Sequence, residues 1–159
     1  MGNQPNIVNC RKPLFMAKSS REEGIGIKYS DKSAGQPELV PIFNTIAKML
    51  KTHAAGSLKI KGGEGGQITL NSDKPVVIDG RKKDELCLAS ALIQKGYVGF
   101  YYMPIYMNDA VRKRMGAELM KTLKGKACFH IKKNDPVLFK QMEEALDIGV
   151  EVYKKFGWI

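Results

Sequence analysis

Residues 96–132 constrain the fold most, because they hold two of the most strand-like stretches of the chain. They begin with GYVGFYYMPIYM, a strongly aromatic run after a glycine, and end with LKGKACFHIK, a short apolar run flanked by lysines. Just before them, the apolar run 86–93 is joined to 97–103 by Gln94-Lys95-Gly96. Apolar runs connected by a glycine turn are typical of a β-hairpin. We therefore expect paired strands at 86–93 and 97–103, with a further strand at 127–131.

The spacing of apolar residues before and after this stretch predicts one helix before the strands and another after them. Apolar residues at spacings of four, three and four mark one face of a first helix; they are Leu39, Phe43, Ile46 and Leu50. The period then changes to two, which predicts short strands at 58–61, 67–70 and 76–78. Helical pieces follow within 108–123, and Asp135-Pro136 begins a long helix that ends at Gly157. The predicted class is α+β, a mainly antiparallel sheet with the N- and C-terminal helices packed on one face.

The length of 159 residues, 43% of them hydrophobic, fits one domain with a real core. We place this domain at 36–159. Residues 1–35 mix polar, basic and glycine residues without a sustained period, so we interpret them as an N-terminal arm. Such arms often lie on their own domain or on a neighbour, which leaves a homodimer through the arm as a possibility. Without a readable membrane span or secretory signal, we expect a cytoplasmic protein with no membrane partner.

The chain is strongly basic, with 26 Lys and Arg against 16 Asp and Glu and a net charge of +10. This balance favours an anionic small molecule or macromolecule as partner. Basic side chains lie in turns or strand ends that adjoin the aromatic strand, and exposed rings beside them would form a stacking platform with phosphate contacts. The candidate ligand-binding residues are Arg81, Lys83, Tyr97, Tyr101, Arg112, Lys124, Lys126, His130 and Lys132. Alternatively, alternate rings form the core and the lysines solvate its rim.

Catalytic patterns are weak. Cys128 and His130 lie two residues apart, so their side chains share one strand face, and such a pair can form an activated thiolate. However, no third orienting group or oxyanion donor is identifiable in the sequence. The glycine-rich run 62–66 lacks the Gly-Lys-Ser/Thr ending of a phosphate loop and indicates a hairpin loop instead. We expect a non-enzymatic protein without a cofactor.

Several blocks in a fixed order resemble the YdhG-like domain family, a family named as a domain of unknown function. The blocks are GRKKDEL at 80–86, YVGFYYMP at 97–104, RKRM at 112–115 and KGKACFHIK at 124–132, followed by Asp135-Pro136 and a terminal helix. The resemblance covers about 37–157. It implies an α+β sandwich close in layout to frataxin, and some members are described as frataxin-like intracellular iron chaperones.

Iron handling is therefore the alternative to anion binding. The first helix departs from the frataxin pattern, because it offers only Glu38 and carries Lys48 and Lys51. A second candidate site lies on the last helix, where three carboxylates fall at i, i+4 and i+8; they are Glu143, Asp147 and Glu151. The same spacing also fits a solvated helix face. Our main expectation is a non-enzymatic binding module for an anionic ligand, with iron binding at these carboxylates as the alternative.

Overall fold

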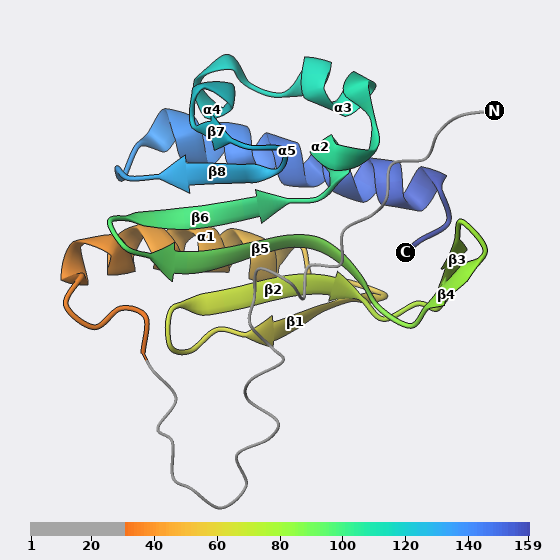
Figure 1. Ribbon diagram of the computed structural model, residues 1–159, viewed down its shortest axis with the longest axis horizontal. Coiled ribbons are helices and arrows are strands. Elements are labelled where there is room, and N and C mark those ends of the chain that lie inside the picture. The colour runs from red at the N-terminus through yellow and green to blue at the C-terminus, as the bar shows by residue number, and fades with distance from the viewer. Residues whose placement is uncertain (1–30) are drawn as a thin grey trace, which may run out of the picture.

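A computed structural model of the protein describes residues 31–159 and has the predicted α+β architecture (Figure 1). Its six-stranded sheet has the order β1-β2-β5-β6-β8-β7, and all neighbouring strands are antiparallel. These strands are β1 Leu58–Gly62, β2 Gln67–Ser72, β5 Leu86–Gln94, β6 Tyr97–Tyr102, β7 Leu123–Lys124 and β8 Cys128–Ile131. The helices are α1 Val40–Thr52, preceded by the short 3-10 helix η2 Pro37–Leu39, then α2 Pro104–Met107, α3 Asp109–Arg114, α4 Ala117–Lys121 and α5 Pro136–Lys155. Of the predicted arm, residues 1–30 lie outside the described residues.

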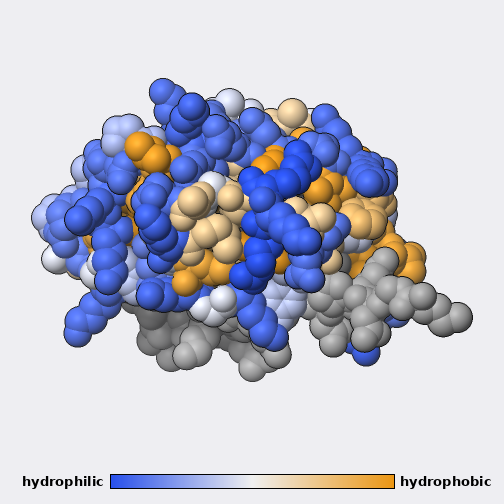
Figure 2. Space-filling view, turned by 90° about the horizontal axis from the view of Figure 1, so that it is seen from above, coloured by the Kyte–Doolittle hydropathy of each residue, from blue (hydrophilic) through white to orange (hydrophobic). Residues whose placement is uncertain are grey.

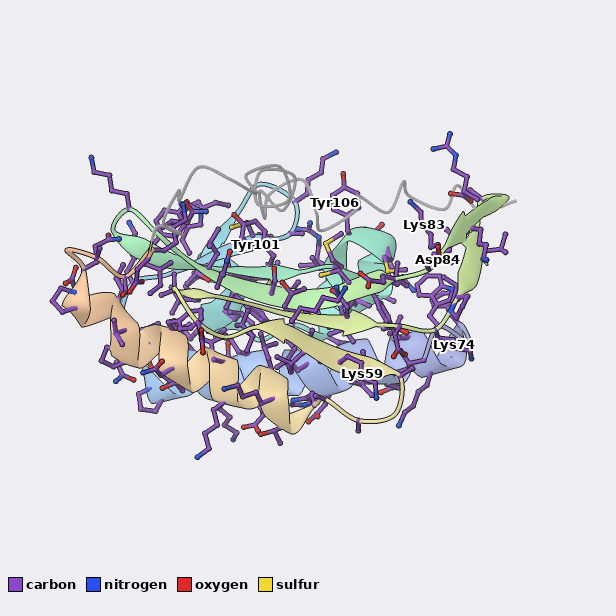
Figure 3. All side chains as sticks on the ribbon, turned by 90° about the horizontal axis from the view of Figure 1, so that it is seen from below. Lys59, Lys74, Lys83, Asp84, Tyr101 and Tyr106 are labelled. Carbon is purple, nitrogen blue, oxygen red and sulfur yellow. The ribbon has the colours of Figure 1, made fainter. Side chains whose placement is uncertain are left out.

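Both long helices, α1 and α5, lie on the same face of the sheet (Figure 3). Their apolar stripes and one side of the sheet form the core, because burying these surfaces together removes them from water. On β6, Val98, Phe100 and Tyr102 point into this core and are fully buried, whereas Tyr97 and Tyr101, which alternate with them, are only partly buried. The expectation that alternate rings of this strand belong to the core is thus confirmed.

The end of β6 approaches α5 closely. The Tyr102 hydroxyl donates a hydrogen bond to the Ala145 carbonyl oxygen at 2.5 Å. Gly149 allows this approach, since a Cβ atom there would lie 3.0 Å from Pro104 Cγ and 3.1 Å from the Tyr102 hydroxyl oxygen. The N-terminus of α5 is also as predicted, because the Asp135 side chain accepts a hydrogen bond from the Val137 N–H and a proline occupies the first turn.

The short helices α2, α3 and α4 form a separate layer beside β8 and contact α5 (Figure 1). Two side-chain contacts join this layer to α5. Arg114 binds Glu151 through two nitrogen–oxygen pairs of 3.0 and 2.9 Å, and the Gln141 side-chain oxygen accepts a hydrogen bond from the Leu119 N–H at 2.8 Å. Viewed from this side, the molecule is covered largely by hydrophilic residues, with small apolar patches between them (Figure 2).

Two local expectations are incomplete. Residues 81–83, where no strand was expected, form the strand β4 Arg81–Lys83, which pairs with β3 Val76–Ile78 in a separate hairpin. Its two-residue turn, Asp79-Gly80, has positive φ angles of 51° and 74°, the requirement of a tight hairpin turn that Asp-Gly meets well. In addition, α2 forms directly after Pro104, where only the end of a strand was expected. None of the described helices is long and apolar enough to cross a membrane.

Candidate anion-binding surface

The side of the sheet opposite α1 and α5 carries several of the predicted ligand-binding residues. In the strand register, Gly99 lies opposite His130, and Cys128 lies opposite Tyr101 on one side and Lys124 on the other. Because successive side chains alternate between the faces of a strand, these residues share one face. Figure 3 shows Tyr101 and Tyr106 on this side of the sheet, away from both long helices.

Tyr97 and His130 form a stacked pair on this face. Their ring centroids are 3.8 Å apart and the ring planes differ by 12°. Both side chains remain partly exposed. Partial burial, together with the nearby positive charges of Lys124 and Lys132, lowers the pKa of His130 below its ordinary value. The imidazole is therefore neutral near pH 7, which lets it stack on Tyr97 without adding a further charge beside the two lysines.

Tyr101 lies next to this pair, across a glycine. A Cβ atom on Gly99 would be 3.1 Å from Cε2 of the Tyr101 ring and 3.7 Å from Cys128 Sγ, so the missing side chain leaves room for the ring. Burial raises the pKa of Tyr101 to about 12, and it also raises the pKa of the Cys128 thiol. Cys128 is therefore a protonated thiol at neutral pH, whereas an activated nucleophile requires a lowered thiol pKa.

A basic depression lies beside the turn before β8, at the opposite end of this strand from His130. It has a volume of about 310 Å³ and is lined by Ile105, Tyr106, Asp109, Arg112 and Lys126. Lys126 Nζ lies 5.4 Å from the centroid of the Tyr106 ring, within the range of a cation–π contact. Lys126 belongs to the turn between β7 and β8, whereas Arg112 comes from α3. The fold thus brings together two cations and a ring from three separate elements.

The cations of this surface lack acidic partners within the structure. Among residues 31–159, no carboxylate oxygen lies within 4.0 Å of the side-chain nitrogens of four exposed cations; these are Arg112, Lys124, Lys126 and Lys132. Among residues 31–159, a carboxylate partner is present for Arg114 and a few lysines, and several cations elsewhere also lack one. What distinguishes this surface is that its cations lie around one depression and beside one stacked pair. The surface therefore carries a local excess of positive charge.

Seven of the nine predicted ligand-binding residues lie along this surface, and two lie elsewhere. Arg81 and Lys83 belong to β4, and their hairpin extends from the end of the sheet that is farther from Tyr97 (Figure 1). Figure 3 shows Lys83 on the same side of the sheet as Tyr106, toward this hairpin. Arg81 and Lys83 precede β5, whereas Tyr97 follows it, so the nine-residue length of β5 separates them from the stacked pair. Sequence reasoning also left Asp109, which lines the depression, out of the candidate set.

The three carboxylates of the alternative metal site have different surroundings. Asp147 Oδ1 lies 2.9 Å from His53 Nε2, at the end of α1, and Glu151 is paired with Arg114 of α3. Glu143 is exposed. In the described part of the chain, no group of three or more His, Cys, Asp or Glu residues is arranged to hold a metal ion.

The chain was also compared with known proteins. No family model matches it, and neither a curated protein nor a solved structure matches it significantly. The resemblance to the YdhG-like family therefore stays a hypothesis, and any function must be argued from the surface itself.

Proposed function

We propose that this protein is a non-enzymatic, cytoplasmic binding module for an anionic ligand, which it holds at the basic depression. The observation that supports this most is the meeting of Arg112 and Lys126 around the Tyr106 ring, without a carboxylate within 4.0 Å of either cation among residues 31–159. The two cations repel each other because they carry like charges. An anion bound between them attracts both and offsets this repulsion.

The chemistry of the two cations suits a phosphate or a similar oxyanion. The guanidinium of Arg112 offers a planar set of N–H donors, whereas the ammonium of Lys126 acts as a compact charge. Asp109 also lines the depression. Its carboxylate accepts hydrogen bonds, so it favours a ligand that carries hydrogen-bond donors besides its anionic group, or a water molecule bound next to the ligand. The net charge of +10 would attract anions from a distance and speed their association.

The iron alternative has less support from the structure. Glu151 is paired with Arg114, so a metal ion there would have to displace the guanidinium. Asp147 contacts the imidazole of His53, but among residues 31–159 these side chains do not form a group of three metal ligands. A cationic guanidinium next to a carboxylate also opposes the binding of a cation there. We therefore propose anion binding alone.

Single substitutions at the depression test this proposal. Replacing Lys126 or Arg112 with alanine should weaken the binding of inorganic polyphosphate about fivefold each, because each removes one charge-assisted contact. Isothermal titration calorimetry at low salt would measure the dissociation constants. The matched control is Lys154→Ala on α5, which removes the same charge from the opposite side of the sheet. Equal affinities for all four proteins, or an affinity that does not change with salt, would contradict the proposal.

The affinity should also depend on pH through His130. Its pKa is lowered by burial and by Lys124 and Lys132, so the ring is neutral near pH 7 and gains a proton as the pH falls. The added charge should tighten polyphosphate binding about threefold between about pH 7.5 and about pH 5.5, the factor expected for one exposed ion pair. By linkage, bound polyphosphate should raise the pKa of His130.

This pH dependence has a direct control. In His130→Gln, the affinity measured at the same two pH values and constant ionic strength should change much less. The ring-proton chemical shift of His130 in NMR spectra, followed with and without polyphosphate, reports the change in its pKa. A pH dependence that persists undiminished in His130→Gln would assign it to other groups.

A further inference from the structure

The stacked pair of Tyr97 and His130 carries no charge near pH 7, so at that pH it can contribute to ligand binding by stacking rather than by charge. Rings that remain partly exposed on a sheet face can stack on a planar group of a ligand. The pair already has a parallel arrangement, with ring centroids 3.8 Å apart and an angle of 12° between planes. A further flat ring can extend this stack at little entropic cost, because the two side chains are already ordered.

Positive charges lie on both sides of the stacked pair. Lys124 of β7 lies opposite Cys128, two residues before His130, and Lys132 follows His130 by two residues. Both lysines are exposed, and their charges lower the pKa of His130. A planar group on the pair would therefore lie between two cations. This alternation of ring and charge matches a ligand in which planar groups alternate with anionic groups.

A second ring and cation lie at the turn before β8. Lys126 belongs to this turn, with its Nζ over the Tyr106 ring, and precedes His130 by four residues. The stacked pair and the basic depression are therefore two separate places where a ring lies beside a cation. A simple anion can occupy only the depression, whereas a ligand with several planar and anionic groups can contact both places.

From these observations, and building on the proposed anion binding, we infer that the ligand class is single-stranded nucleic acid. A base stacks on Tyr97 and His130, and phosphates contact Lys124, Lys132 and the basic depression. Single strands are favoured over duplexes because their bases are free to stack on side chains. Heparin-like and polyphosphate chains provide the charge but no planar ring for the stacked pair.

The test compares four probes of matched length, about 12 nucleotides or the equivalent charge. They are a fluorescent oligothymidylate, an abasic strand with the same phosphates, a DNA duplex and inorganic polyphosphate. We expect the oligothymidylate to bind about tenfold more tightly than the abasic strand, because stacking of a base on aromatic side chains has about this effect. Fluorescence anisotropy and competition at constant salt give the affinities.

Variants of the stacked pair separate stacking from folding. Tyr97→Leu should lose about tenfold in oligothymidylate affinity and leave polyphosphate affinity unchanged, whereas Tyr97→Phe keeps the ring and should bind as the wild type does. At pH 7.5, about one unit above the ordinary pKa of histidine, the ring of His130 is uncharged. His130→Phe keeps an uncharged aromatic ring, so it should likewise retain oligothymidylate binding at this pH. Unchanged circular dichroism spectra would show that each variant is folded.

The outcomes distinguish this inference from the proposed function. If polyphosphate and the abasic strand bind as tightly as oligothymidylate and Tyr97→Leu has no effect, the nucleic-acid inference is overturned while anion binding stands. Duplex binding as tight as single-strand binding, again insensitive to Tyr97→Leu, would also overturn it. If none of the four probes binds, both the inference and the proposed function fail.

Discussion

Replacing Tyr102 with alanine is expected to lower the free energy of unfolding by about 4 kcal/mol, the largest stability effect that we predict for one substitution. The Tyr102 side chain is 0% exposed and packs between the end of β6 and α5. Truncation removes the ring from the core and leaves a cavity, because Gly149 and Ala145 offer no large side chain to fill it. The substitution also removes the hydrogen bond to the Ala145 carbonyl oxygen.

Urea denaturation followed by circular dichroism measures this effect, and two variants divide it. Tyr102→Phe keeps the ring but removes the hydroxyl, so it should cost about 1–2 kcal/mol. Tyr106→Ala removes a partly exposed ring from the basic depression and should cost less than about 1 kcal/mol. If Tyr102→Ala were no more destabilising than Tyr106→Ala, the packing of β6 against α5 would not contribute as described.

The helices and most strands were predictable because their signals are local. The stripe at Leu39, Phe43, Ile46 and Leu50 requires only a helical period, and all four residues are buried. The start of α5 follows from Asp135 and Pro136, which satisfy the first turn of a helix whatever it packs against. The alternation of side chains along a strand likewise predicted that some of the aromatic rings of 97–102 would lie in the core, and Phe100 and Tyr102 are buried there.

The order of the strands was not predictable in the same way, because it depends on contacts between distant segments. The pairing of β6 with β8 across the three short helices brings His130 beside Tyr97. No local pattern in either segment specifies this neighbour. The charged segment 81–83 was missed as a strand because Arg-Lys-Lys has no apolar alternation, although Asp79-Gly80 before it is a strong hairpin signal.

For the candidate site, too, the residue types could be predicted from the sequence, whereas their arrangement in space could not. Proximity in sequence placed Arg81 and Lys83 with the aromatic strand, but the length of β5 separates them from Tyr97. By contrast, Arg112 and Lys126 are as far apart in sequence as Lys83 and Tyr97, but they line one depression, because α3 and the turn before β8 meet there. Residue type and charge could therefore identify candidate residues, whereas their grouping required the fold.

That grouping leads to the largest effect expected on binding. A variant with alanine in place of four cations of this surface should lose more than about 100-fold in affinity for oligothymidylate and polyphosphate at low salt; the cations are Arg112, Lys124, Lys126 and Lys132. For a single strand, the loss of four phosphate contacts should also reduce the slope of log affinity against log salt by about 3. Anisotropy titrations at several salt concentrations measure both quantities.

A second fourfold variant controls for total charge. Lys48, Lys51, Lys154 and Lys155 are exposed on α1 and α5, and their replacement with alanine removes the same charge from the net +10. Because those helices lie on the opposite side of the sheet, only long-range attraction is lost, and the affinity should fall about threefold. If both fourfold variants lost affinity equally, the ligand would respond to net charge alone, and the surface along β8 would not be its binding site.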